Sequence, residues 1–329
     1  MSGRVELLRL LADGAVHSGE ELAAALSISR AAVWKRLQQL ESWGIACEAR
    51  PGSGYRLEAP IDLLDPARIR ELLPSPTLGM LRRLEVHESL QSTSDRLLAT
   101  DEPSAGRFDA CLAEFQSAGR GRRGRHWVAP FASGLCLSIN WGYRDAPAML
   151  GALSLAAGVA ALRALGRLGV NRLSLKWPND ILRGEAKLGG ILIDLRGEAA
   201  GPAYVVVGIG INVRLPRAAR DQLAADGVEA ADLATLGGAP PRNELAAVLI
   251  TELTQALVEF GARGLAAFAD EWRAVDALAD RPVRVMQGGE PLTGLARGVD
   301  GDGALLLEVD GARRRILSGE VSVRPILGS

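Results

Sequence analysis

The residues best suited to chemistry form a short loop rich in arginine and glycine. Gly119, Gly121 and Gly124 alternate with four arginines over residues 119–125, between two strand-like patterns. Glycine lets the backbone approach an anion closely and present its N–H groups, and a planar guanidinium matches phosphate oxygens. The loop therefore predicts a polyphosphate site, and a solvated loop or a nucleic-acid patch remain the alternatives. Neither a Walker A lysine nor a dinucleotide-binding glycine spacing is present.

A second candidate site contains two of the three lysines, in a chain where 35 of the 38 basic residues are arginine. Lys176 opens the segment Lys-Trp-Pro-Asn-Asp, which ends at Asp180, and Lys187 follows seven residues later. A compact ammonium fits between a carboxylate and a phosphate where a guanidinium does not. Asp180 could hold a metal ion, receive a proton from an amine, or simply pair with Lys176 across the proline turn.

Two weaker groups complete the candidates. Ser92, Thr93 and Ser94 precede a helix expected over residues 95–100, so their hydroxyls either cap that helix or donate to a polar ring. Gly208 and Gly210 end the most apolar strand pattern, where they either ease sheet packing or make room for a flat ligand.

The elements that position these residues form a central layered domain over residues 66–276. Apolar, branched runs predict strands, and amphipathic patterns predict helices. The expected strands are 84–87, 110–116, 134–141, 173–177, 189–195 and 204–211. One helix is expected to begin at Pro66 and to end before Pro74 and Pro76, and further helices are expected over 150–168, 244–260 and 265–275. This alternation predicts a mixed α/β domain within an α+β multidomain chain.

Residues 1–60 predict a winged helix-turn-helix. A helix ends at Asp13-Gly14, Ser18 and Glu21 form a capping box for a second, and Ser29 caps a third that Gly44 ends. A hairpin over residues 45–57 supplies the wing. The polar face of the third helix and the wing give the expected DNA contacts: Ser29, Arg30, Trp34, Lys35, Gln38, Arg50 and Arg56. Seven basic and seven acidic residues in this segment make any DNA affinity a matter of local charge.

The remaining residues, 280–329, alternate short apolar pairs with glycine turns, which predicts a small β-barrel of the Src-homology-3 type. Net charge is −1, so no whole-chain field favours nucleic acid. Three separated cysteines and three histidines make a disulfide framework or a Cys/His zinc cluster improbable. No uncharged run reaches the ~20 residues that span a bilayer, so a cytoplasmic protein without membrane contact is expected.

Read in order, these motifs resemble the bifunctional bacterial biotin-protein ligases and biotin operon repressors. The resemblance rests on HSGEELAAALSISRAAVWKRLQQLESWG with the wing PGSGYRL, then GRGRRGRHW, KWPND, KLGGILID and GIGIN, and finally the RPV and GALLL segments. It covers nearly the whole chain. Each motif alone is only suggestive, whereas the ordered set is specific.

The resemblance implies an ATP- and Mg²⁺-dependent enzyme that forms biotinyl-5′-AMP and passes biotin to a lysine of the biotin carboxyl carrier protein of acetyl-CoA carboxylase. It implies Lys187, Asp180 and Arg122 as catalytic residues. Biotin would contact Ser92, Thr93, Ser94, Gln116, Arg120, Gly121, Arg122 and Lys187. The nucleotide would contact Gly119, Arg123, Gly124, Trp127, Lys176, Asn179 and Asn212. No protein cluster holds a metal in this scheme beyond a contact of Asp180 with Mg²⁺.

The resemblance also implies operator DNA as a partner and a homodimer that forms with adenylate bound. Two departures bear on this. Ser94 stands where the family often has asparagine, and residues 221–235 lack the tryptophan that folds over the adenylate in the best-known repressor of this type. A winged-helix regulator that senses a ligand without chemistry, and a lipoate- or octanoate-handling ligase, are the rival functions.

Overall fold

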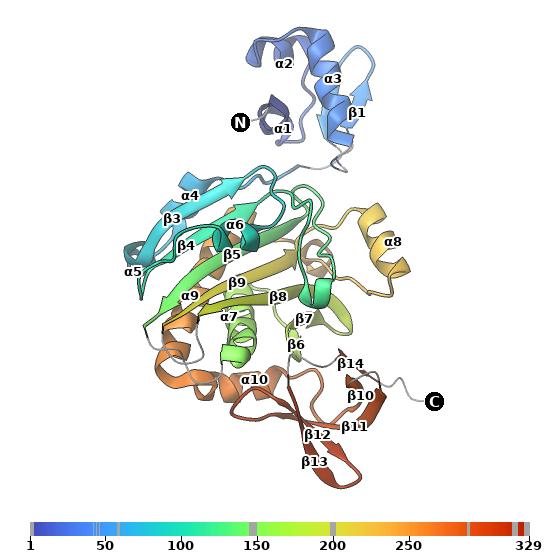
Figure 1. Cartoon of the computed structure of the whole chain (residues 1–329). Coiled ribbons are helices and arrows are strands. Elements are labelled where there is room, and N and C mark those ends of the chain that lie inside the picture. The colour runs from blue at the N-terminus through green and yellow to red at the C-terminus, as the bar shows by residue number, and fades with distance from the viewer. Residues whose placement is uncertain are drawn as a thin grey trace.

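The computed structural model describes residues 3–41, 43, 45, 47–57, 60–144, 150–197, 202–287, 290–317 and 322–325. Three units follow one another along the chain (Figure 1): a small helical unit, a large sheet with helices, and a small β unit.

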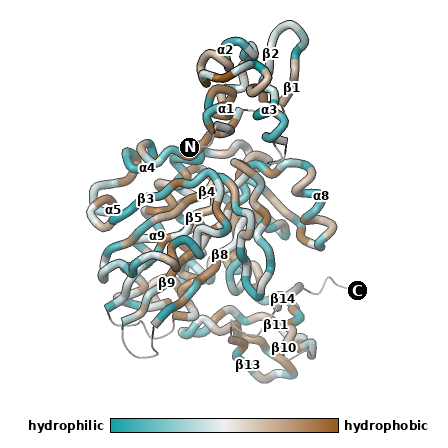
Figure 2. Tube along the Cα trace, turned by 45° about the horizontal axis from the view of Figure 1, so that its top comes forward, coloured by the Kyte–Doolittle hydropathy of each residue, from teal (hydrophilic) through white to brown (hydrophobic). Residues whose placement is uncertain are grey.

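The N-terminal unit is the expected winged helix-turn-helix. Its helices are α1 (Gly3–Leu11), α2 (Gly19–Ala25) and α3 (Arg30–Glu41), and its wing pairs β1 (Cys47–Arg50) with β2 (Gly54–Leu57). Ser18 and Glu21 make both bonds of the capping box, and the Ser29 hydroxyl accepts from the N–H of Ala32. The predicted cap Gly44 lies outside the described residues. Hydrophobic residues of α1, coloured brown in Figure 2, lie in the core of this unit.

The central unit is a seven-stranded sheet with the order β3-β4-β5-β9-β8-β7-β6. Only β3 (Leu81–His87) and β4 (Phe108–Ala113) run parallel. The antiparallel strands are β5 (Gly134–Tyr143), β6 (Ser174–Lys176), β7 (Asp180–Arg183), β8 (Ala186–Gly197) and β9 (Ala203–Asn212). The expected six strands are present, and β7 was not predicted because its four residues directly follow a tight turn. The prediction that residues 110–116 form one strand is too long, since β4 ends at Ala113.

Helices cover the two faces of this sheet unequally. The long helices α7 (Leu153–Arg167) and α9 (Arg242–Arg263) pack on one face together with α10 (Ala269–Val275), and the short α6 (Thr93–Leu98) lies on the other (Figure 1). Neighbouring residues of β8 confirm this division: Ile191 lies beside Gly158 of α7, whereas Leu192 pairs with Gly208, which lies under Ser94 of α6. Three further short helices are α4 (Pro66–Leu72), α5 (Ser75–Met80) and α8 (Arg217–Ala225).

Three expected elements differ in detail. The helix expected from Pro66 ends before Pro74, as predicted, but Pro76 lies in the first turn of a second helix, α5, where a missing N–H is tolerated. Helix α6 begins at Thr93 rather than at Asp95. Helix α8 occupies part of the segment 221–235 that the sequence indicated as a loop.

Two segments, Leu150–Arg167 and Arg242–Val275, are long and apolar enough to cross a membrane. Two thirds of the 18-residue apolar window in each segment lies buried inside the protein, because these segments contain the core helices α7 and α9. Their apolar character is therefore explained by packing against the sheet.

The C-terminal unit is an antiparallel sheet with the order β13-β12-β11-β10-β14. Its strands are β10 (Pro282–Gln287), β11 (Glu290–Val299), β12 (Leu305–Val309), β13 (Ala312–Ile316) and β14 (Ser322–Pro325). The last strand, β14, returns to pair with the first, β10, as expected for a small β-barrel. A hydrogen bond links this unit to the central one: the indole N–H of Trp177 in the central unit donates to the carbonyl of Gly303 at 2.9 Å.

Candidate active site

A buried ring of hydroxyl and amide groups lies where α6 meets the sheet. Thr93 Oγ1 lies 2.7 Å from Ser138 Oγ, and Ser94 Oγ lies 3.0 Å from the same atom. Gln116 Oε1 accepts from the N–H of Thr93 at 2.8 Å. All four side chains are buried, so each hydrogen bond in the ring matters for stability and for ligand recognition.

The three hydroxyls that the sequence placed together divide into two roles. Ser92 is the N-cap of α6, because its Oγ accepts from the N–H of Asp95. Thr93 and Ser94 lie in the first turn and belong to the polar ring. Both alternatives left open by the sequence are therefore realised, in different residues.

Two glycines of β9 make room for side chains above the sheet. A Cβ atom at Gly208 would lie 2.7 Å from Ser94 Oγ, and one at Gly210 would lie 2.4 Å from the Trp127 ring. The indole of Trp127 thus lies against the bare backbone of the strand. Because Gly208 and Gly210 point to the same face, the polar ring and Trp127 are neighbours on the α6 side of the sheet.

Lys187 and Asp180 form an ion pair beside this indole. Lys187 Nζ donates to Asp180 Oδ1 at 2.6 Å and lies 5.9 Å from the centroid of the Trp127 ring. A Cβ at Gly190 would lie 3.4 Å from Nζ. The lysine ammonium therefore occupies a narrow space between a carboxylate, an aromatic face and the backbone of β8.

Asn212 and the segment around residue 230 hold the backbone at Lys187. The N–H of Lys187 donates to the carbonyl of Glu229 at 2.7 Å, and the N–H of Ala231 donates to the carbonyl of Lys187 at 2.9 Å. Asn212 Nδ2 donates to the carbonyls of Lys187 and Ala231. The Asn212 amide thus fixes the lysine-bearing strand.

The arginine-glycine loop has a defined conformation. Gly121 N–H donates to the carbonyl of Arg125 at 2.7 Å, and Arg123 adopts a left-handed φ of 58°. Burial lowers the pKa of the Arg122 guanidinium, and the nearby Asp180 carboxylate opposes this decrease. Arg122 therefore lies within electrostatic range of the Lys187–Asp180 pair.

Arg120 forms ion pairs with two carboxylates. Its Nη1 and Nη2 donate to Asp194 on β8 at 3.1 and 2.7 Å, and Nη2 also lies 2.9 Å from Asp95 on α6. These pairs raise the pKa of Arg120, chiefly through the hydrogen bonds with Asp194. The family resemblance implied a contact of Arg120 with biotin, but the sequence contained no signal for these partners, which lie 74 and 25 positions away.

The remaining predicted residues border this site. Asn179 Nδ2 donates to the carbonyl of Ile191 at 2.7 Å, which joins the turn after β6 to β8. Lys176 is half-buried, and its backbone lies opposite that of Asp180 in the antiparallel pairing of β6 with β7. Gly119 lies against Trp127 and Gln116, and Gly124 has a φ of 70°. Ser138 was not predicted; its signal in the sequence is a polar residue within a mostly apolar strand, and the structure places it opposite Gly208.

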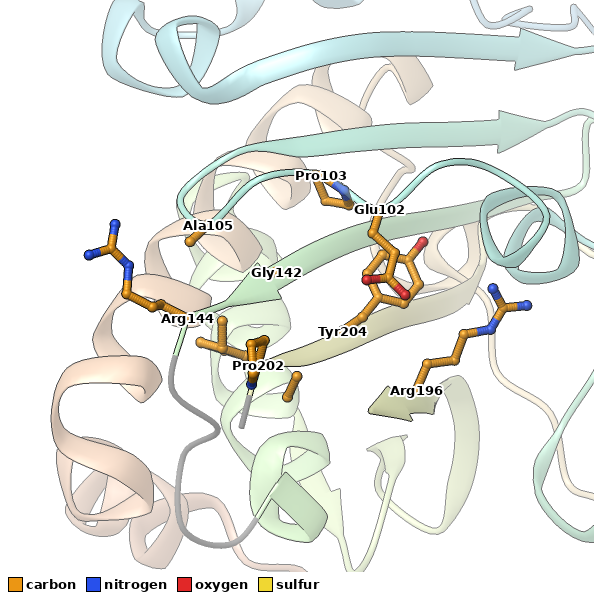
Figure 3. Close-up of a pocket in the computed structure, with 10 residues that line it drawn as sticks. Glu102, Pro103, Ala105, Gly142, Arg144, Arg196, Pro202 and Tyr204 are labelled. Atoms are coloured by element: carbon orange, nitrogen blue, oxygen red, sulfur yellow. The ribbon is translucent and has the colours of Figure 1, made fainter. Parts of the chain in front are cut away.

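A separate pocket of about 290 Å³ lies at the other ends of the same strands (Figure 3). Glu102, Arg196 and Tyr204 are among its lining residues, and none of the predicted site residues is. The site near Lys187 lies instead at the end of β9 where Asn212 pairs with Gly134.

The predicted DNA-binding face is exposed but partly neutralised. Trp34 is 54% exposed, and Ser29, Lys35 and Gln38 are exposed with it on α3. Arg30 pairs with Glu20, and both Arg50 and Arg56 pair with Glu48. Phosphates would have to compete with these carboxylates for the arginines.

Each of the three units matches a known protein family. Residues 86–212 match the Biotin/lipoate A/B protein ligase family, residues 5–56 an HTH domain, and residues 279–324 the Biotin protein ligase C terminal domain. The chain is 41% identical to the bifunctional ligase/repressor BirA of Salmonella typhimurium over 97% of its own length and 96% of that protein's.

The chain belongs to the bifunctional biotin ligase/repressor family. A second relative, the bifunctional ligase/repressor BirA of Escherichia coli, is 39% identical over 97% of each chain. Among solved structures, the biotin protein ligase from Aquifex aeolicus in complex with biotin and ATP is 28% identical, with a TM-score of 0.60, and covers 75% of this chain and 99% of its own. The expected family, fold class and type of activity are confirmed, whereas the roles of single residues stay predictions.

Proposed function

We propose that this chain joins biotin to ATP and then transfers the biotinyl group to a carrier lysine. The observation that carries the proposal is the arrangement on one sheet face of a buried hydroxyl–amide ring, the Lys187–Asp180 pair and the arginine-glycine loop. The ring suits a small neutral polar head group, and the cationic part suits a carboxylate beside a phosphate.

On the biotin side, the buried groups bind the ureido head. Thr93, Ser94 and Gln116 offer hydroxyl and amide atoms to it, and Ser92 acts through the N-cap of the helix that carries them. Ser138 holds both hydroxyls in place. Arg120 and Gly121 shape the loop above the pocket.

Adenylation needs no nucleophile from the enzyme. The biotin carboxylate oxygen attacks the α-phosphorus of ATP, a P–O bond forms, and pyrophosphate leaves. Lys187 contacts the carboxylate and an α-phosphate oxygen, and Arg122 adds positive charge as negative charge is redistributed. Catalysis is therefore a matter of positioning and electrostatic stabilisation.

Transfer to the carrier follows at the same place. The neutral amine of the carrier lysine attacks the acyl carbon of biotinyl-5′-AMP, a C–N bond forms, and AMP leaves. Asp180 orients this amine and accepts its proton, since its carboxylate already binds an ammonium at 2.6 Å.

The nucleotide lies on the other side of Lys187. Trp127 supplies a flat apolar face, and the remaining contacts come from the loop and from strand ends: Gly119, Arg123, Gly124, Lys176, Asn179 and Asn212. Asp180 would be the carboxylate that contacts Mg²⁺, and the phosphates of ATP would supply further oxygen ligands.

The proposed ligase activity is tested with purified protein, biotin, ATP and a biotin carboxyl carrier domain. We expect mass spectrometry to find one biotinyl group on one carrier lysine, and none on a carrier in which that lysine is arginine. Failure to modify the carrier while biotin still binds would support the rival regulator without chemistry.

We also propose that the chain is a cytoplasmic, biotin-responsive repressor. Helix α3 would contact bases in the major groove and the wing would contact phosphates, with a dimer on a two-fold operator once adenylate is bound. Mobility-shift and sedimentation experiments with and without biotinyl-5′-AMP test both parts. DNA from the protein's own biotin genes that stays unshifted at low salt in either state would contradict the repressor role.

A further inference from the structure

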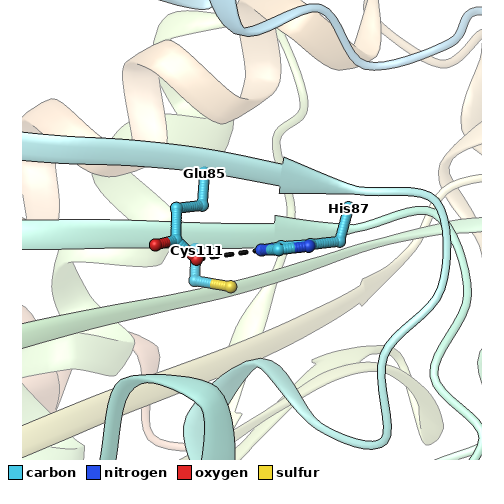
Figure 4. Close-up of side chains that lie close together, drawn as sticks. All are labelled: Glu85, His87 and Cys111. Atoms are coloured by element: carbon cyan, nitrogen blue, oxygen red, sulfur yellow. Dashed lines mark hydrogen bonds and ion pairs between the residues drawn. The ribbon is translucent and has the colours of Figure 1, made fainter. Parts of the chain in front are cut away.

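We propose that Glu85, His87 and Cys111 form a binding site for a zinc-type divalent cation on the sheet face beside α6. Their ligand atoms all lie within 4.8 Å of one another (Figure 4). This site is separate from the predicted biotin and nucleotide contacts, none of which it shares.

Strand geometry brings the three donors together. Glu85 and His87 are two positions apart on the edge strand β3, so their side chains point to the same face. Cys111 lies on the neighbouring strand β4 in direct register with Glu85. His87 Nε2 already lies 2.9 Å from Glu85 Oε2. The donors therefore come from two rigid, paired strands rather than from loops.

The donor set selects the kind of ion. A sulfur, an imidazole nitrogen and a carboxylate oxygen together suit Zn²⁺ or a similar transition metal, whereas Mg²⁺ and Ca²⁺ favour oxygen donors. In a tetrahedral zinc site neighbouring donors lie roughly 3.5 Å apart, so small side-chain rotations would close the present cluster around an ion. Glu85 and His87 are 21% and 31% exposed, which leaves access for the ion and for a water as fourth ligand.

Binding would change the protonation of Cys111. Cysteine binds a metal ion as the thiolate. When the cation binds, the S–H bond breaks, a sulfur–metal bond forms and the proton leaves to solvent. One carboxylate and one thiolate balance the charge of the dication, and the Arg96 guanidinium beside Glu85 leaves the cluster with one net positive charge.

Arg96 of α6 competes for Glu85 but does not block the site. Its Nε donates to Oε2 at 2.9 Å and its Nη2 donates to Oε1 at 3.0 Å. A cation that binds Oε2 would replace the His87 and Nε contacts, and Oε1 would keep its bond with Nη2. The retained bond gives the Glu85 ligand a partner outside the metal, as metal-binding carboxylates commonly have.

The site is tested by titrating the full-length, reduced, metal-free protein with Co²⁺. We expect one equivalent to produce a near-ultraviolet band from thiolate-to-cobalt charge transfer, and one equivalent of Zn²⁺ but not millimolar Mg²⁺ to abolish it. Cys111→Ser should remove the band, and His87→Gln should weaken cobalt binding at least tenfold. The half-buried Cys47 and the buried Cys136 provide matched controls, since Cys47→Ser and Cys136→Ser should keep the band.

Absence of a thiolate band in the wild-type protein would overturn the proposal. A band that survives in Cys111→Ser and disappears in either control variant would also overturn it. Because His87 is partly exposed, His87→Gln is expected to fold even if the buried Cys111 does not tolerate serine, and unchanged cobalt affinity in that variant would equally refute the site.

Discussion

Replacing Lys187 by arginine keeps a positive charge but changes its shape. The Lys187 ammonium lies 2.6 Å from Asp180, 5.9 Å from the centroid of the Trp127 ring, and against the backbone at Gly190. A guanidinium is larger and planar, so it cannot occupy this space without displacing the aspartate, the indole or the reacting oxygens.

The expected loss is specific to catalysis. Removing one preorganised donor from a developing charge costs about 2.7–4 kcal/mol, which slows a reaction roughly a hundredfold to a thousandfold. The ion pair is partly exposed, at 29% and 26% for its two side chains, so its contribution to stability is about 0–1 kcal/mol. We therefore expect a folded protein with adenylation slowed about a hundredfold.

The assay is biotin-dependent pyrophosphate release, with thermal unfolding measured on the same sample. Lys35→Arg is the matched control because that lysine lies exposed on α3, far along the chain from the site, and it should retain the wild-type rate. Near-normal pyrophosphate release by a well-folded Lys187→Arg protein would show that charge alone suffices and would refute the argument from shape.

Three further predictions concern the loop, the DNA face and the buried charge. Arg122→Gly should release adenylate faster and biotinylate bystander lysines, measured by blotting a protein mixture; labelling confined to the carrier would contradict a retaining role. Replacing Arg30 and Lys35 together by alanine should weaken operator binding at least tenfold and lower its salt dependence, with ligase activity unchanged; an unaltered shift would exclude α3. Although burial opposes ionisation, ion pairs with Arg82 and other partners lower the pKa of Asp109 from 3.8 to about 2, which stabilises the fold by about 2 kcal/mol above pH 4 and is lost as pH falls toward 2. Asp109→Asn should therefore lose stability at pH 6 in urea denaturation; unfolding that matches the wild type at pH 6 would contradict this.

Local sequence signals predicted local structure well. The capping box of Ser18 and Glu21, the helix start at Pro66 and the hairpin of the wing all formed where they were predicted. These features depend on residues only a few positions apart. Strand β7 was missed because it has only four residues, whereas helix α8 was missed although its pattern is amphipathic.

Local sequence patterns could not predict which side chains from distant segments contact one another. The family resemblance implied that Thr93 and Gln116 share a site, but Ser138 joined them only through the register of β5 with β9. Arg120 met Asp194 and Asp95 for the same reason. The Glu85, His87 and Cys111 cluster has no sequence signature, since its ligands depend on the parallel pairing of β3 with β4.

The ligase mechanism is tested most directly by isolating its intermediate. The full-length protein is mixed in excess with ATP labelled at the α-phosphate and with biotin, in the absence of any carrier, and the bound nucleotide is separated after acid quench. We predict biotin-dependent conversion of the label to biotinyl-5′-AMP in a single turnover, with a wild-type rate about a hundredfold above that of Lys187→Arg. Label that stays in ATP, or appears only as free ADP or AMP without biotin dependence, would contradict the proposed chemistry.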